Sequence, residues 1–425
     1  MFSKCVSFGI LIVACSAAVQ AQPDYVASEA LRQAGLVKFW QLKLPLHADQ
    51  RVRDCYLVDD QLYVTTNDGV AYAVDAHSGA LRWVRQVTRG GYRLTAPCHT
   101  ADRAIFGTPA QITQYSRRYG DPIIQTDLRF PAGSAPATDG VRFFVGGINQ
   151  RLYAFPLNLD FEVWKTGLWG RVIPRPVLFG PNLFFASDSG DVYAANAADK
   201  ELVWRHRLGG TISADLVIDE NGLYIASENR SLYLLNRNVG GMRWRARLSS
   251  PLREAPVVTP EVAYQFSELD GLVAINTATD PGVERIRWKN AYARAMLTRT
   301  DRFVYLLSRD QQILVANEKT GDVSQNIPAA GLSIHASDPG GSSIYLAGSD
   351  GRVFCARPTG TPLPTAADVQ AALFRKKPSR AVATSAPADG DAGERAARTS
   401  SPRMPPIGGT SEVTKRVTGG SGDPP

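Results

Sequence analysis

The histidines and aspartates of this sequence are too scattered to predict a metal centre or a catalytic pair. No two histidines stand at a metal-ligand spacing. We therefore expect solvent-exposed or turn-shaping histidines at His47, His77, His99, His206 and His335. Four aspartates fall in polar turns, where Asp commonly caps backbone N–H groups and calcium binding is the alternative role: Asp68, Asp188, Asp191 and Asp350. Because neither a nucleophile elbow nor a phosphate-binding loop is present, we predict no catalytic residue and no metal ligand.

The cysteine content excludes a disulfide-rich scaffold, because the chain has only five cysteines in 425 residues. Cys55 and Cys98 lie near the starts of the innermost strands of two successive repeats. In an oxidising compartment these two thiols could form a structural disulfide, and two buried free thiols are the alternative. Cys355 would then be the unpaired cysteine.

The N-terminus has the layout of an export signal. A weakly basic start at Met1–Lys4 precedes an apolar run too short to span a bilayer, and Val19-Gln20-Ala21 supplies small residues for cleavage. We predict a signal peptide over residues 1–21. The alternative is a bacterial lipoprotein cleavage box at Ile12–Ser16, in which Cys15 becomes the lipidated first residue and tethers the protein to a membrane. Both interpretations place the mature protein outside the cytoplasm, in the periplasm or cell envelope.

The distribution of charge argues against a nucleic-acid partner. The formal net charge is +7, but residues 22–360 hold 37 basic and 34 acidic residues and are close to balanced. Residues 361–425 carry nine Lys/Arg against six Asp/Glu. Without a long basic run the chain lacks the electrostatic footprint of a nucleic-acid-binding protein.

An apolar strand recurs along the chain every 39–42 residues. The central residues of its eight copies are Tyr63, Ile105, Phe144, Phe184, Tyr224, Tyr264, Tyr305 and Tyr345. Each copy is followed by a polar turn and a strand with alternating apolar residues, and most units then carry a tryptophan strand, at Trp83, Trp164, Trp204, Trp244 and Trp288. Four short strands per period of about 40 residues predict an all-β fold, an eight-bladed β-propeller of four-stranded antiparallel blades. A large β-sandwich is the alternative, but it gives no reason for the period.

The two ends of the repeat region complement each other. The eighth unit lacks a tryptophan strand, whereas the segment Val37–Leu42 has no preceding blade and carries Trp40, 43 residues before Trp83. We therefore expect the N-terminal strand to close the last blade and remove the open sheet edges. This predicts one closed, monomeric ring over residues 37–358.

The end of the first unit, from Ala73 to Trp83, resembles the tryptophan-docking motif Ala-x-Asp-x-x-Thr/Ser-Gly-x-x-x-Trp of the quinoprotein-like (PQQ-like) propeller repeats. Looser copies end at Trp204, Trp244 and Trp288. The resemblance implies that each Trp, including Trp40 and Trp164, packs between neighbouring blades while its N–H finds a backbone acceptor.

Two functional classes share these repeats. Quinoprotein dehydrogenases hold pyrroloquinoline quinone (PQQ) and Ca²⁺ over the propeller axis, whereas an outer-membrane assembly lipoprotein uses eight such blades as a scaffold without cofactor. The ring leaves little room for active-site insertions, and an adjacent Cys-Cys pair and a Cys-x-x-Cys-His haem motif are both absent. We expect a non-catalytic scaffold that binds a protein partner in the cell envelope. A PQQ-dependent oxidoreductase with calcium is the alternative.

The best candidate for partner contact is the loop around Leu168, Trp169 and Arg171, because Trp169 is the one tryptophan outside the docking frame. Packing of Trp169 over the end of the ring is the alternative.

Two segments flank the predicted ring. Residues 22–36 are expected to form a short helix and linker. Residues 359–425, rich in Pro, Ala, Gly, Ser and Thr, are expected to be disordered apart from a short helix near Ala366–Arg375. Contact with a membrane is expected only through the lipid anchor.

Overall fold

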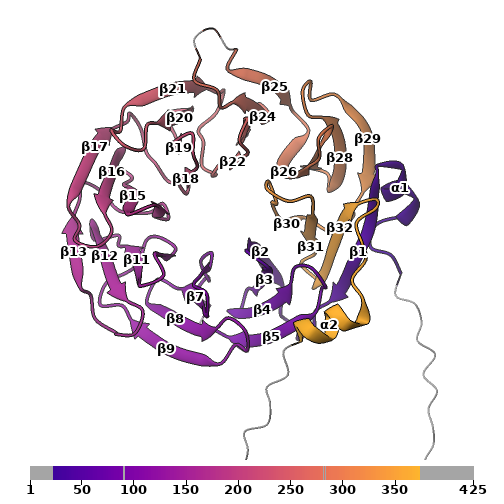
Figure 1. The fold of residues 1–425 in the computed structure, drawn as a ribbon, viewed down its shortest axis with the longest axis horizontal. Coiled ribbons are helices and arrows are strands. Elements are labelled where there is room, and N and C mark those ends of the chain that lie inside the picture. The colour runs from indigo at the N-terminus through magenta and orange to yellow at the C-terminus, as the bar shows by residue number, and fades with distance from the viewer. Residues whose placement is uncertain (1–22, 90, 281, 283, 374–425) are drawn as a thin grey trace, which may run out of the picture. The chain divides into compact units, whose positions relative to one another are not determined.

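The computed structural model describes residues 23–373 except residues 90, 281 and 283. In this part of the chain eight four-stranded antiparallel sheets surround a central axis (Figure 1). Seven of the sheets consist of four strands that are consecutive in the chain, running from the axis outward. The predicted eight-bladed β-propeller is confirmed.

The first four blades are built from strands β2 to β17, and the strands of each blade follow one another from the axis outward. Blade 1 contains β2 (Val52–Val58), β3 (Gln61–Thr66), β4 (Val70–Asp75) and β5 (Leu81–Gln86). Blade 2 contains β6 (Cys98–His99), β7 (Arg103–Gly107), β8 (Gln111–Ser116) and β9 (Pro122–Asp127). Blade 3 contains β10 (Ala137–Thr138), β11 (Arg142–Gly146), β12 (Arg151–Pro156) and β13 (Trp164–Gly167). Blade 4 contains β14 (Val177–Phe179), β15 (Asn182–Ala186), β16 (Asp191–Asn196) and β17 (Leu202–Arg207).

The remaining strands complete the ring. Blade 5 contains β18 (Val217–Ile218), β19 (Leu223–Ser227), β20 (Ser231–Leu235) and β21 (Met242–Arg247). Blade 6 contains β22 (Val257–Val258), β23 (Val262–Ser267), β24 (Gly271–Asn276) and β25 (Ile286–Asn290). Blade 7 contains β26 (Ala293–Arg299), β27 (Phe303–Ser308), β28 (Gln312–Asn317) and β29 (Val323–Pro328). Blade 8 contains β30 (Ile334–Ala336), β31 (Ile344–Ala347), β32 (Arg352–Pro358) and β1 (Leu36–Lys43).

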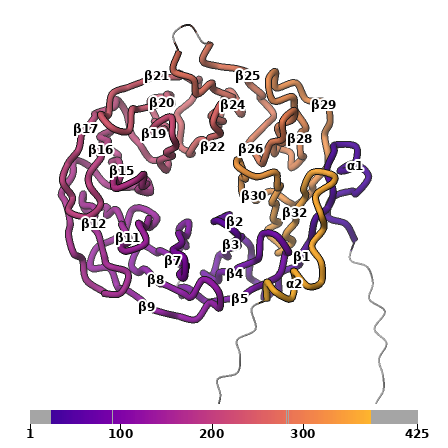
Figure 2. Tube along the Cα trace, viewed as in Figure 1, coloured from indigo at the N-terminus to yellow at the C-terminus, as the bar shows by residue number. Residues whose placement is uncertain are grey.

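Blade 8 joins the two ends of the ring. The N-terminal strand β1 pairs antiparallel with β32, from Leu36 opposite Pro358 to Lys43 opposite Arg352. Figure 2 shows the indigo start of the ring beside its orange end. The predicted closure by the N-terminal strand is confirmed, and no blade has to end the ring with an open face.

The hydrophobic core lies between the blades. The middle strands β3 and β4 are buried along their whole length, because a neighbouring blade covers each face of the sheet. The outer strand β21, in contrast, alternates exposed and buried residues after its first position. This pattern explains why the middle strands read as apolar runs and the outer strands as alternating ones.

Two short helices flank the propeller. Helix α1 (Ser28–Gln33) buries Leu31 against blades 7 and 8, and the chain then turns at Gly35, whose φ of +72° favours glycine. Helix α2 (Ala366–Ala372) starts at Thr365, whose side chain accepts a hydrogen bond from the Asp368 N–H in a capping box. The chain is thus described beyond Pro358, to residue 373. The predicted signal peptide, Cys15 and residues 374–425 lie outside the described residues.

No helix within the described ranges is both long and apolar enough to span a bilayer.

Candidate functional site

The two ends of the ring carry different connections. Because the strands of a blade are antiparallel, turns such as β2–β3 and β4–β5 lie at one end, which we call the Asp59 end. Turns such as β3–β4 and the links between blades lie at the other, which we call the Trp169 end.

The predicted partner loop connects β13 and β14 at the Trp169 end. Leu168 packs against the core between blades 3 and 4, whereas the neighbouring Trp169 is 66% exposed. The structure therefore separates the two apolar residues of this loop, with one anchoring it and the other presented to solvent. The alternative, in which Trp169 packs over the ring, is not what the structure shows.

Hydrogen bonds hold this loop in place. The Trp169 N–H donates to the Tyr193 hydroxyl at 3.4 Å, and the Ser189 hydroxyl donates to the Trp169 carbonyl at 2.7 Å. The Arg171 backbone N–H and side-chain Nε each donate to the Asp188 carboxylate at 2.7 Å. Trp169 is thus displayed on a backbone fixed by blade 4, so little conformational entropy is lost when a partner covers it.

Other large apolar side chains are exposed at the same end of the ring. They belong to turns and links of blades 1, 3 and 6, namely Tyr92, Ile148, Leu269 and Tyr292. Exposed large apolar residues also occur at the Asp59 end, among them Val141, Phe161 and Val239, so it is the exposed tryptophan that distinguishes the Trp169 end. A tryptophan is the residue most often found at the energetic centre of a binding surface.

The other tryptophans join the blades. Five of them donate the indole N–H to a backbone carbonyl in the outer turn of the next blade, at 2.8–3.2 Å: Trp40 to Ala76, Trp83 to Arg117, Trp204 to Arg237, Trp244 to Thr277 and Trp288 to Glu318. Each of these tryptophans is at least 90% buried. At several of these junctions a glycine lies against the indole ring. A Cβ added to Gly321, for example, would come within 2.6 Å of Trp288.

Trp164 departs from this pattern. Its indole nitrogen is buried and has no hydrogen-bond partner. In the corresponding turn of blade 4, the Ala198 carbonyl accepts from Arg142 at 3.0 Å. The expectation that every docking tryptophan finds a backbone acceptor is therefore wrong for Trp164.

Blades 2 and 7 have no tryptophan at the docking position. Arg103 and Gln114 of blade 2 both donate to the Leu157 carbonyl in blade 3, at 2.6 and 3.1 Å. Gln325 of blade 7 donates to the Ala30 carbonyl of α1 at 3.0 Å. Long polar side chains thus take over the tryptophan's hydrogen bond to the neighbouring element.

Of the two possibilities for Cys55 and Cys98, a disulfide or two buried free thiols, the structure shows the buried free thiols. Cys55 packs in the core between blades 8 and 1, whereas Cys98 packs in the core between blades 2 and 3. The two thiols therefore point away from their shared blade junction and cannot form a bond without rebuilding both strands. Burial raises the pKa of Cys98 to about 11, so its thiol is unreactive at neutral pH.

The inner strands enclose a cavity of about 460 Å³ on the axis of the ring. Residues from six blades line it, and its charged side chains and histidine are Asp59, His99, Arg175 and Asp215. The Arg175 backbone N–H donates to the Asp215 carboxylate at 2.8 Å.

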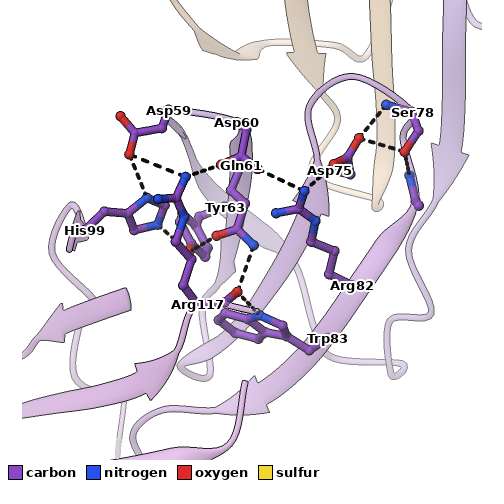
Figure 3. Close-up of polar contacts among 11 residues, drawn as sticks. Asp59, Asp60, Gln61, Tyr63, Asp75, Ser78, Arg82, Trp83, His99 and Arg117 are labelled. Atoms are coloured by element: carbon purple, nitrogen blue, oxygen red, sulfur yellow. Dashed lines mark hydrogen bonds and ion pairs between the residues drawn. The ribbon is translucent and has the colours of Figure 1, made fainter. Parts of the chain in front are cut away.

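His99 belongs to a polar network between blades 1 and 2 (Figure 3). Its side chain is 4% exposed and lies 2.5 Å from the Tyr63 hydroxyl and 3.2 Å from the Asp59 carboxylate. Burial, assisted by the nearby Arg117 charge, lowers the pKa of His99 to about 4. His99 is therefore neutral and structural at pH 7, and the expectation of a solvent-exposed or turn-shaping histidine is wrong at this position.

Arginines complete this network. The Arg117 guanidinium pairs with Asp60 across the junction, and Arg82 pairs with both Asp60 and Asp75. Burial alone would raise the pKa of Asp60, but hydrogen bonds from Arg117 and Arg82 outweigh it and hold that pKa below its usual value. The Arg117 carbonyl also accepts from Gln61 and Trp83, so one residue ties the two blades together through both its side chain and its backbone.

The channel holds few side chains that could bind a cofactor or a metal ion. Across residues 23–373, leaving out 90, 281 and 283, no three His, Cys, Asp or Glu side chains converge to hold a metal ion. Asp59 and His99 are engaged in the junction between blades 1 and 2.

The eight four-stranded blades, the closure of the ring by β1 and the docking tryptophans define the class of protein. It is an eight-bladed β-propeller with blades that resemble PQQ-like repeats. A family model described as "Outer membrane protein assembly factor BamB" matches residues 149–236 and 212–280. Together with the blade architecture, this match over part of the chain supports a PQQ-like β-propeller family. No curated protein sequence matches the chain.

Solved structures share the fold at low sequence identity. BamB from Moraxella catarrhalis is 16% identical, with a TM-score of 0.62 over 77% of this chain and 99% of that chain. The computationally designed Ika8 protein is 10% identical, with a TM-score of 0.60 over 74% and 98%. The C-terminal WD40 domain of Sif2 is 11% identical, with a TM-score of 0.55 over 76% and 99%. At these identities the likeness shows a common propeller architecture.

Proposed function

We propose that this protein is a non-catalytic scaffold that binds a protein partner at the Trp169 end of its ring. The observation that carries the proposal is the exposed Trp169 side chain on a loop fixed by Tyr193, Ser189 and Asp188. An exposed tryptophan on a backbone held by hydrogen bonds is a typical centre of a protein interface.

The setting proposed for this scaffold is the bacterial cell envelope, in the assembly of outer-membrane proteins. The match of residues 149–280 to a family model of an outer-membrane protein assembly factor supports this role. The N-terminal sequence supports export, by cleavage after Ala21 or by lipidation of Cys15. Mass spectrometry of the mature N-terminus separates these two routes.

The test is complementation of a deletion strain with full-length variants. Trp169→Ala is expected to weaken partner binding by roughly thirty-fold or more, the usual loss at an interface centre, and to lower the amount of folded outer-membrane barrel protein. Val141→Ala is the matched control, because Val141 is 67% exposed at the Asp59 end. Full complementation by Trp169→Ala at normal protein levels would contradict the proposal.

A PQQ-binding oxidoreductase is the second candidate, and its only structural support is the channel cavity, where Arg175 could pair with a ligand carboxylate. Calorimetric titration of the folded chain with PQQ, with and without Ca²⁺, tests it. We expect no saturable heat. One-site binding at micromolar affinity would replace the scaffold proposal.

A further inference from the structure

The outer wall of blades 4, 5 and 6 is rich in arginine. On each outer strand, three side chains near the docking tryptophan point away from the core. They stand one residue before the tryptophan, one residue after it and three residues after it. Strands β17, β21 and β25, which lie side by side on the rim (Figure 1), carry a cation at all but two of these positions. The cations are Arg205, Arg207, Arg243, Arg245, Arg247, Arg287 and Lys289. We call this set the arginine wall.

The other blades lack such a surface. At the equivalent positions on their outer strands, the cations are Arg82, Lys165 and Lys43, and each of them pairs with a carboxylate. The remaining equivalents include Val84, Gln125 and Asn326, which carry no charge. At these outer-strand positions of the described chain, cations without a carboxylate partner therefore occur only in blades 4, 5 and 6, although the repeats are similar in sequence.

Most of the arginine wall has no carboxylate to neutralise it. Asp191 pairs with Arg205, but the equivalent of Asp191 in the next blade is Ser231, whose hydroxyl oxygen accepts from Arg245 at 2.8 Å. Lys289 pairs with Asp270. Among the described residues no ion pair reaches the other members, Arg207, Arg243, Arg245, Arg247 and Arg287. Unpaired guanidinium groups attract phosphate strongly and bind it through two parallel hydrogen bonds.

Exposed apolar side chains adjoin these arginines. Leu202 and Met242 are 56% and 54% exposed at the first positions of β17 and β21. Val203 and Val239, on the same strand and in the turn before β21, are 47% and 70% exposed. The wall therefore joins a cationic surface to apolar side chains at its Asp59 end.

We propose that the arginine wall binds the anionic headgroup surface of a phospholipid membrane. The arginines would pair with lipid phosphates while Leu202, Val203, Val239 and Met242 enter the interface between headgroups and acyl chains. This combination of cations with exposed apolar residues is typical of proteins that lie on a membrane surface. A single-stranded nucleic acid would instead favour exposed aromatic side chains for base stacking, and the exposed side chains adjoining this wall are aliphatic.

The experiment measures binding of the full chain to lipid vesicles by flotation. Every version carries Cys15→Ser, so that no acyl chain can tether the protein. The wild-type ring is compared with the triple variant Arg207→Gln, Arg243→Gln and Arg247→Gln, whose side chains make no ion pair in the described structure. The matched control changes three exposed arginines elsewhere on the ring, Arg89→Gln, Arg151→Gln and Arg302→Gln.

We expect the wild type and the control to bind vesicles of phosphatidylcholine mixed with phosphatidylglycerol, and to release them at high salt. Since each arginine near an anionic surface contributes about five-fold to binding, the triple variant should bind about 100-fold more weakly. Pure phosphatidylcholine vesicles should bind none of the three. Equal melting temperatures show that each variant folds, and Arg243→Glu alone should weaken binding more than Arg243→Gln.

Several outcomes would overturn the proposal. Wild-type protein that fails to bind the anionic vesicles, or a triple variant that binds as well as the control, removes the arginine wall as a lipid site. Tight binding to polyglutamate or to DNA without binding to vesicles assigns the wall to a different anionic partner. None of these results bears on Trp169, so the proposed scaffold function is tested separately.

Discussion

The contribution of the tryptophan hydrogen bonds between blades to stability can be measured by comparing two equivalent tryptophans. Trp244 donates to the Thr277 carbonyl at 3.2 Å, whereas the buried indole nitrogen of Trp164 has no partner. The two rings are similarly buried, 6% and 9% exposed, and occupy equivalent positions in blades 5 and 3. Replacing each tryptophan by phenylalanine removes the same atoms at both positions, but a hydrogen bond is lost only at position 244.

The expected difference follows from the carbonyl that is left behind. Trp244→Phe leaves the carbonyl of Thr277, a residue only 2% exposed, without its indole donor, which costs about 1–3 kcal/mol of stability. Trp164→Phe removes a buried N–H that was already unsatisfied, so it loses only packing. We therefore expect Trp244→Phe to lower the free energy of unfolding by about 1–3 kcal/mol more than Trp164→Phe.

Urea denaturation of both variants, followed by tryptophan fluorescence and far-UV circular dichroism, measures this difference. The two probes must give the same midpoint for the comparison to be valid. An equal loss of stability in the two variants would refute the argument that the indole hydrogen bond contributes to blade docking.

Two further predictions concern stability. Gly321→Ala should lower the free energy of unfolding by about 1–3 kcal/mol more than Gly180→Ala, because both have positive φ but only Gly321 would place a Cβ 2.6 Å from Trp288; equal urea midpoints would contradict the predicted clash. Burial lowers the pKa of both His99 and His335 from 6.5 to about 4, so the unfolded chain takes up protons in this range that the folded ring does not. Stability should therefore be full above pH 6.5 and fall as the pH drops towards 4, by up to about 3 kcal/mol for each histidine. His99→Gln should flatten part of this dependence in urea midpoints measured against pH, and an unchanged slope would show that His99 is not buried in its neutral form.

The fold was predictable from the sequence because the same strand pattern recurs in every blade. A period near 40 residues, seen in strands centred on Tyr63, Phe144, Tyr224 and their equivalents, specifies one blade at a time, and a ring of identical units needs no long-range information beyond closure. Closure itself was visible in the sequence, because the surplus strand containing Trp40 matched the strand missing after Arg357.

The sequence left open whether Cys55 and Cys98 form a disulfide, and the strand pairing explains why they are free thiols. Cys98 pairs with Ile105, the central residue of its neighbouring strand, whereas Cys55 pairs with Val64, one residue beyond the equivalent Tyr63. Because successive side chains of a strand point to opposite faces, Cys55 faces blade 8, as Val64 does, and Cys98 faces blade 3, as Ile105 does. Sequence spacing places residues along a strand but determines their face only once the pairing is known.

The Trp164 and His99 environments were hidden for different reasons. Lys200 stands in the blade 4 turn, with φ of +64°, at the position that Gly79 and Gly321 occupy elsewhere, so the missing glycine was a signal that this docking site differs. His99 had no local signal, because its partners Tyr63 and Asp59 lie 36 and 40 residues away in another blade.

The central claim is that Trp169 is the contact point for a protein partner in the envelope. A photo-crosslinking amino acid placed at position 169 in living cells tests this most directly, with position 141 as the control. The account predicts one crosslinked product at position 169, containing a protein of the outer-membrane assembly machinery, and none at position 141. Equal crosslinking at both positions, or none at 169 in a folded and exported ring, would contradict it.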